Sequence, residues 1–174
     1  MNVLDAIQKR REITRFSEKE IPKETLESVV EAAFLAPSGN HLPSREFIVV
    51  TKRDMLDHLA DATPFVPWLK EAAAAIVVTG RPTVSKYWLQ DASIAAGYVW
   101  LTAVDLELGA AFGAIYHAED QSESEKRESF VRKALNISDD RKVVAILGLG
   151  YPEKQPDKKK QFPREEIIHY EKFS

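Results

Sequence analysis

The chain contains no cysteine among its 174 residues. This absence excludes disulfides, thiolate metal ligands, cysteine-bound iron–sulfur clusters and thiol nucleophiles. Long apolar runs are also missing, because the longest covers only residues 72–78, whereas a membrane-spanning helix needs ~20 residues. A charge already stands at Asp5, too early for a secretory signal. We therefore expect a cytoplasmic, single-domain protein without a membrane partner.

Neither sign of charge is in large excess. Lys and Arg total 24 and Asp and Glu total 27, which gives a formal net charge of −3. A nucleic-acid-binding domain usually carries a clear basic excess, so we expect no nucleic-acid partner. The four histidines show no pair at metal-ligand spacing, so we expect no metal site. The sequence also lacks the nucleophile elbow of serine hydrolases and the phosphate loop of nucleotide-binding proteins.

Apolar periodicity and β-branched runs give a coarse map of the secondary structure. Helices are predicted at 3–9, 22–35, 54–60 and 86–106, and strands at 46–51, 74–79 and 143–149. The second helix should end before Pro37, because proline cannot continue a helix. The strands are almost continuously apolar, which indicates a sheet covered on both faces.

The predicted helix 86–106 is apolar around nearly its whole circumference, with Gln90, Asp91 and Ser93 as its polar exceptions. A helix that is apolar all round has to be buried all round. In a domain of this size, we expect a second subunit to supply part of that burial. The helix therefore predicts a homodimer.

The C-terminal segment changes character after Pro152. Residues 153–163 include two prolines and four lysines, a composition typical of an extended, solvated stretch. Residues 166–173 are again apolar enough to form a strand or a docked arm. We expect this segment to be an arm that wraps around the partner subunit.

Three segments could bind an anion, and each also has a plain structural explanation. Arg10 and Arg11 follow the first helix, where their charge also suits the helix dipole. The turn 37–40 offers a hydroxyl, an amide and backbone donors, as many helix ends do. The lysine run 158–160 could contact a phosphate or simply be solvated.

Taken together, these segments resemble the nitroreductase family of flavoproteins in content and in order. The segments that carry the resemblance are the arginine motif at 10–16, the turn at 31–40 with Pro43 beyond it, the first core strand at 46–50, the glycine-containing stretch 108–113, and the stretches 144–152 and 165–170. The resemblance covers nearly the whole chain.

The resemblance implies an α+β, nitroreductase-like fold. Its features are a central mixed sheet flanked by helices, a long central helix at a homodimer interface and a C-terminal arm wrapping the partner. Residues 1–150 would form the FMN-binding domain, and residues 151–174 would complete the domain and the dimer. The implied activity is oxidation of NAD(P)H by an FMN enzyme, with ping-pong hydride transfer to nitroaromatic, quinone or similar small electron acceptors.

The resemblance also carries over a set of FMN-binding residues. They are Arg10, Arg11, Glu12, Pro37, Ser38, Gly39, Asn40, Phe112, Gly113, Lys159 and Lys160. The arginines and lysines would hold the phosphate, the turn 37–40 would contact the flavin from the other subunit, and the 112–113 peptide would lie beside the ring. No acid–base side chain is needed for hydride transfer to the flavin, so we expect no catalytic residue.

Two positions depart from the family pattern. The family usually has a small hydroxyl residue where Glu12 stands and a basic residue where Thr14 stands. A carboxylate near a phosphate is repulsive unless it is paired. We therefore expect Glu12 to turn toward Arg15, an amide or a ribityl hydroxyl.

Other functions remain open at this stage. The same fold could support dehalogenation, enone reduction or flavin fragmentation, with residues 62–70 as the one candidate lid. A non-enzymatic flavin-binding protein is a further alternative. The last alternative is a dimeric structural domain without a cofactor.

Overall fold

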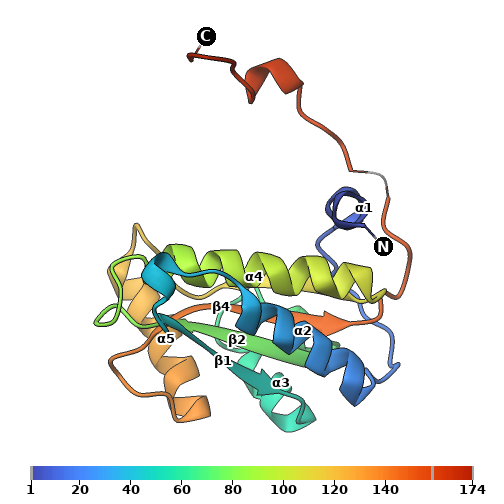
Figure 1. The fold of residues 1–174 in the computed structure, drawn as a ribbon. Coiled ribbons are helices and arrows are strands. Elements are labelled where there is room, and N and C mark those ends of the chain that lie inside the picture. The colour runs from blue at the N-terminus through green and yellow to red at the C-terminus, as the bar shows by residue number, and fades with distance from the viewer. Residues whose placement is uncertain (1, 158, 174) are drawn as a thin grey trace.

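The computed structural model describes residues 2–157 and 159–173 of the chain. Over these residues, helices pack on both faces of a four-stranded sheet (Figure 1). The strands are β1 (Arg45–Val50), β2 (Ala74–Gly80), β3 (Gly109–Ala114) and β4 (Lys142–Gly150), in the spatial order β1-β2-β4-β3. The helices are α1 (Val3–Lys9), α2 (Lys23–Leu35), α3 (Arg53–Leu59), α4 (Trp88–Asp105) and α5 (Gln121–Leu135), with short 3-10 turns at Gly39–His41, Pro67–Lys70 and Arg164–Glu166.

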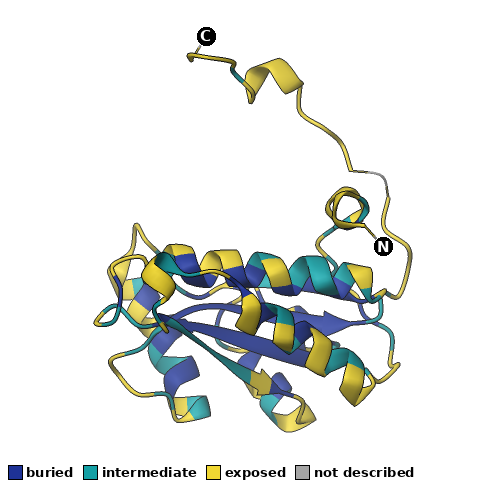
Figure 2. Ribbon diagram, viewed as in Figure 1, coloured by how far each residue is buried: buried dark blue, intermediate teal, exposed yellow. Residues whose placement is uncertain are grey.

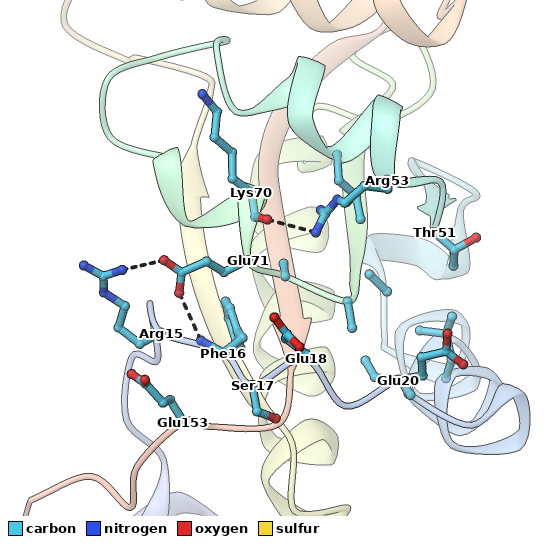
Figure 3. Close-up of a pocket in the computed structure, with 16 residues that line it drawn as sticks. Arg15, Phe16, Ser17, Glu18, Glu20, Thr51, Arg53, Lys70, Glu71 and Glu153 are labelled. Carbon is cyan, nitrogen blue, oxygen red and sulfur yellow. Dashed lines mark hydrogen bonds and ion pairs between the residues drawn. The ribbon is translucent and has the colours of Figure 1, made fainter.

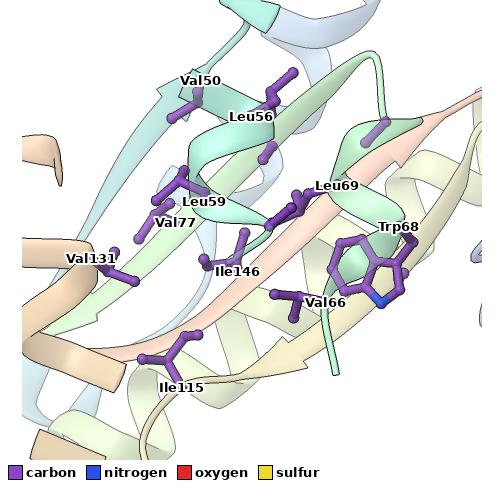
Figure 4. Close-up of a cluster of buried hydrophobic side chains, with 14 of the residues drawn as sticks. Val50, Leu56, Leu59, Val66, Trp68, Leu69, Val77, Ile115, Val131 and Ile146 are labelled. Atoms are coloured by element: carbon purple, nitrogen blue, oxygen red, sulfur yellow. The ribbon is translucent and has the colours of Figure 1, made fainter. Parts of the chain in front are cut away.

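The two central strands, β2 and β4, are buried along almost their whole length (Figure 2). Their alternate side chains point to opposite faces and build two apolar cores. Val77 and Ile146 belong to the core under α3 and α5, which Figure 4 shows. Ile76 and Leu147 belong to the core under α2 and α4. The prediction of a sheet covered on both faces is confirmed.

Helix α4 lies across the sheet and packs against it through its own small side chains. Ala92, Ala95, Ala96 and Ala103 are buried and bring the helix close to the strands. On its opposite side, Ile94 is 44% exposed and Tyr98 is 43% exposed. One chain therefore buries only part of this apolar helix, and its burial by a second subunit stays a prediction. Among the described residues, no helix is long and apolar enough to cross a membrane.

The predicted α+β class is confirmed, and the predicted helices and strands are found to within two residues at most ends. The expected mixed sheet is wrong for the described strands, because all three strand pairs are antiparallel. Parallel pairing is confined to an isolated bridge between Glu12 and Ala110. The consecutive strands β2 and β3 run in the same direction, but β4 lies between them, so no two neighbouring strands are parallel.

Helix α5 is a further difference, because we predict no helix between residues 121 and 135. Its sequence is rich in charge, and three of its charged residues, Arg127, Glu128 and Arg132, are buried. The Glu128 carboxylate is fully buried and accepts hydrogen bonds from the Ser124 hydroxyl at 2.8 Å and the Val143 backbone N–H at 2.9 Å. The Arg132 guanidinium pairs with the same carboxylate. The periodicity of apolar residues does not predict α5, because polar contacts attach this helix to β4.

Of the two expectations for the C-terminal segment, a strand or a docked arm, the structure shows no strand within the described residues. After a short turn at Arg164–Glu166, it continues without a strand partner. Figure 1 shows this segment passing beyond α1 and ending away from the sheet. Phe162, Ile167 and Tyr170 are exposed by 66–78%. A strand needs a neighbouring strand to satisfy its backbone, and the described residues of this segment pair with none.

Candidate functional site

The N-terminal segment that carries the arginines is fixed to the edge of the sheet. The Ile13 backbone N–H donates to the Ala110 carbonyl of β3 at 3.0 Å. A β-carbon on Gly109 would lie 2.7 Å from the Ile13 side chain, so only glycine allows this close approach. Further along, the Ser17 backbone N–H donates to the Tyr151 carbonyl at 2.9 Å. The segment therefore lies against β3 and the end of β4.

Arg10 stacks on an aromatic ring of α4. Its guanidinium carbon lies 4.6 Å from the centroid of the Trp100 ring, and the residue is half-buried. Its guanidinium forms no hydrogen bond or ion pair with another described residue. A cation–π contact of this kind uses no hydrogen bond, so the N–H donors of the guanidinium stay available. Arg10 is therefore placed to bind an anion.

Arg11, in contrast to Arg10, uses its guanidinium in hydrogen bonds to backbone carbonyls. Its Nε–H donates to the Asp157 carbonyl at 2.9 Å, and its Nη1 donates to the Gln8 and Arg10 carbonyls at 2.8 Å. These contacts tie the N-terminal segment to the chain that follows β4. The backbone carbonyl of Arg11 in turn accepts a hydrogen bond from Trp100 Nε1 at 3.1 Å.

Glu12 and Phe112 meet at the outer edge of β3. The Phe112 backbone N–H donates to Glu12 Oε1 over 3.4 Å, so Glu12 turns toward an amide, one of the expected partners. The Phe112 ring lies nearly parallel to the Trp100 ring, with centroids 6.1 Å apart. Gly113 is buried, and a β-carbon there would lie 2.2 Å from Val66 Cγ1. Core packing thus accounts for this glycine.

The turn after α2 is held by a buried carboxylate. Gly39 donates its backbone N–H to Asp91 Oδ1 at 2.9 Å, and the Ser44 hydroxyl donates to Asp91 Oδ2 at 2.5 Å. Asn40 and His41 both adopt left-handed backbone conformations, with φ of 54° and 57°. Pro37 and Asn40 are exposed at the surface. The turn therefore presents polar groups outward from a fixed base.

One chain brings only half of the predicted site together. Arg10, Arg11, Glu12 and Phe112 cluster around Trp100, whereas the turn 37–40 is attached to Asp91. Asp91 and Trp100 are nine residues apart on α4, which is about 14 Å along the helix axis. Lys159 and Lys160 are exposed in the C-terminal segment, and Lys158 lies outside the described residues.

Two cavities lie near the N-terminal segment. One of about 1060 Å³ is bordered by Arg15, Phe16 and Glu71 (Figure 3). There the Arg15 guanidinium pairs with the Glu71 carboxylate at 2.5 Å. The other, of about 620 Å³, is bordered by Arg11 and Lys19. The first contains none of the predicted FMN-binding residues and the second only Arg11, so the candidate site is the surface around Trp100 rather than either cavity.

Two residues that organise the site are missing from the prediction. Asp91 is visible in the sequence as a polar exception on an apolar helix, and that signal could have identified it. Trp100 gives no such signal, because an aromatic residue at helical spacing usually belongs to the core. Its importance follows only from the segments that the fold places around it.

Comparisons with known proteins agree on one family. The sequence profile described as "Nitroreductase family" matches residues 7–67. A protein of Methanothermobacter thermautotrophicus named NADH dehydrogenase/NAD(P)H nitroreductase is 32% identical over 99% of this chain and 88% of its own. The structure of an FMN-dependent nitroreductase from Clostridium difficile superposes with a TM-score of 0.89 at 29% identity, covering 98% of this chain and 99% of that one. An iodotyrosine deiodinase of Thermotoga neapolitana is 26% identical over 94% of both chains.

Proposed function

The chain belongs to the nitroreductase family, and we propose that it is an FMN-dependent NAD(P)H oxidoreductase that reduces nitroaromatics, quinones or similar small electron acceptors. The names of its relatives support this proposal, and the similarity extends over nearly the whole chain. The observation that carries it is the Arg10 guanidinium, which is fixed on Trp100 with its donors free.

The residues around Trp100 fit FMN. A phosphate needs charge-assisted donors, and the planar guanidinium of Arg10 offers several in one fork. The Phe112 N–H lies at the open edge of β3, where it can donate to an acceptor on a bound ring in place of the long contact to Glu12. The aromatic pair Trp100 and Phe112 supplies apolar surface beside these donors.

Bound FMN would supply the redox chemistry, taking hydride from NAD(P)H and passing it to the acceptor in a ping-pong cycle. The chain's own residues would bind and orient the FMN. Arg10 would hold the phosphate, and the backbone of β3 would hold the ring. Glu12, the one carboxylate in the cluster, accepts from a backbone amide. Hydride transfer therefore needs no proton from a side chain of this cluster.

The second half of the site would come from a second copy of the chain. The turn 37–40 is attached to α4 about 14 Å from the residue that carries Arg10, and the family resemblance assigns this turn to the other subunit. The outer face of α4, with Ile94 and Tyr98 exposed, offers an apolar surface for dimerisation. The C-terminal segment, residues 151–174, would cross to the partner and bring Lys159 and Lys160 toward the phosphate.

The test is the visible absorption spectrum of the purified dimer before and after anaerobic addition of NADH and NADPH. A flavin spectrum that bleaches with either nucleotide, and returns on addition of a nitroaromatic or a quinone, supports the proposal. A flavin spectrum that neither nucleotide bleaches contradicts it and favours a flavin-binding role. A protein that binds no added FMN contradicts the cofactor assignment itself.

Reductive dehalogenation is the second candidate function. The similarity to an iodotyrosine deiodinase over 94% of both chains supports it. Release of iodide from iodotyrosine by the reduced protein would measure this activity. If iodide release is faster than reduction of nitroaromatics and quinones, the second function replaces the first.

A further inference from the structure

Trp100 lies where three parts of the candidate site meet. Its ring carries the guanidinium of Arg10 at 4.6 Å, and its Nε1–H donates to the Arg11 carbonyl at 3.1 Å. The Phe112 ring lies nearly parallel to it, at an interplanar angle of 8°. Trp100 is half-buried on α4, a helix fixed against the sheet. A rigid element thus holds this side chain against both the N-terminal segment and β3.

We propose that Trp100 is a positioning residue that holds Arg10 ready for the FMN phosphate and so determines the preference for FMN over riboflavin. The inference rests on the proposed function and adds a specificity determinant to it. Riboflavin has the same ring and ribityl chain as FMN and lacks the phosphate. A residue that acts through Arg10 therefore affects the binding of FMN alone.

The stacking geometry gives the first physical reason. A free arginine side chain samples many rotamers, and fixing it on binding lowers affinity. The Trp100 ring attracts the guanidinium through its negative face and holds it before the ligand arrives. This contact consumes no N–H donor, whereas Arg11 spends its Nε–H and Nη1 on three carbonyls. Arg10 is therefore held and still free to bind.

The indole N–H gives the second reason. It donates to the carbonyl of Arg11, which fixes the peptide between Arg11 and Glu12, one residue after Arg10. Phenylalanine keeps an aromatic face but has no such donor. Phe112 packs near the ring and limits its rotation. Trp100 therefore holds the N-terminal segment in two ways: its ring contacts the Arg10 side chain, and its indole N–H binds the Arg11 carbonyl.

The experiment measures dissociation constants of FMN and riboflavin for the apo dimer by quenching of flavin fluorescence. For W100L, we expect the FMN dissociation constant to rise about tenfold and that of riboflavin to stay within about twofold. For W100F, we expect a rise of about threefold for FMN alone, because the ring remains and the donor is lost. The matched control is W88F, since Trp88 lies on the same helix and packs against Tyr116 instead. Its ratio of FMN to riboflavin affinity should equal that of the wild type.

A double-mutant cycle with R10A separates positioning from general packing. If Trp100 acts through Arg10, W100L in the R10A background should weaken FMN by less than about twofold further. An equal loss of both flavins in W100L, or losses that add fully with R10A, overturns the inference. If W100L does not fold, W100F supplies the test. A ratio of FMN affinity to riboflavin affinity in W100F equal to that of the wild type overturns the inference. Failure of the wild-type protein to bind FMN would instead contradict the proposed function.

Discussion

The carboxylate of Asp91 accepts a hydrogen bond from the backbone N–H of Gly39 at 2.9 Å, and so the first turn of α4 fixes the turn 37–40. The second carboxylate oxygen accepts from the Ser44 hydroxyl at 2.5 Å. Asp91 is only 3% exposed, so both of its oxygens depend on these partners. A negative charge near the start of a helix is also stabilised by the helix dipole. The turn that should contact FMN is therefore attached to a rigid element.

Asp91→Ala should destabilise the fold and weaken FMN binding together. The substitution leaves the Gly39 N–H and the Ser44 hydroxyl without an acceptor, which costs about 2–3 kcal/mol of unfolding free energy. Urea unfolding of the apo protein measures this loss. Gln90→Ala, at an exposed neighbouring position, is the matched control and should change stability by less than about 0.5 kcal/mol. A stability unchanged in Asp91→Ala would contradict the role of the carboxylate.

Arg10→Ala should weaken FMN binding by about 1.5–3 kcal/mol, because a charged contact to phosphate is lost. Riboflavin binding should hardly change, which distinguishes phosphate recognition from loss of the fold. Arg11→Ala should have the smaller effect on FMN, since its Nε–H and Nη1 already bind carbonyls. Isothermal titration of the apo dimer with each flavin measures both effects. A larger loss for Arg11→Ala than for Arg10→Ala would reverse the assignment.

Deletion of residues 158–174 should abolish the dimer and FMN binding while leaving the body of the protein folded. The cut retains the Asp157 carbonyl that Arg11 binds and the Tyr151 carbonyl that Ser17 binds. It removes the apolar side chains of the C-terminal segment that one chain leaves exposed, such as Phe162 and Tyr170. Sedimentation velocity and the flavin spectrum test this prediction. A stable yellow dimer without the segment would disprove the wrapping arm.

The sequence predicts those elements whose causes are local. Helix α1 begins after Asn2, whose side chain accepts from the Asp5 backbone N–H at 2.9 Å, and both its ends agree with the prediction. Strands β2 and β4 are predicted from their apolar runs, because burial on both faces leaves that pattern. Helix α5 is not predicted because its buried anchor, Glu128, is polar and the contact that attaches it to β4 comes from the backbone N–H of Val143, 15 residues away.

The candidate site is only partly predictable for a related reason. The arginine segment and the turn 37–40 are visible as short patterns, and the resemblance to a family assigns them to one cofactor. Short sequence patterns do not show that the guanidinium donors of Arg10 are free whereas those of Arg11 are hydrogen-bonded. That difference depends on where the fold places the carbonyls of Gln8 and Asp157. The role of Trp100 likewise depends on which segments the fold brings to α4.

Acid should selectively weaken the turn that precedes β4. The hydroxyl of Ser138, followed by the guanidinium of Arg141, holds the pKa of Asp140 below its ordinary value of 3.8. A lowered folded-state pKa contributes stability above the unfolded pKa, and this contribution is lost as pH falls through the folded pKa. Asp140→Asn should therefore be less stable than wild type at neutral pH, and the difference should shrink below the ordinary pKa and vanish once the pH is below the lowered folded-state pKa. Urea unfolding at a series of pH values measures this, and a difference that persists in strong acid would contradict it.

Glu12→Gln should bind FMN about as tightly as the wild type or up to about threefold more tightly, because it removes a negative charge near the phosphate. The glutamine keeps an acceptor for the Phe112 backbone N–H, so the edge of β3 should be unchanged. Any gain should shrink as salt is added, since exposed charges are screened. Glu18→Gln, at an exposed position further along the same segment, is the control and should leave the affinity unaltered. Loss of FMN in Glu12→Gln would show instead that the cofactor requires this carboxylate.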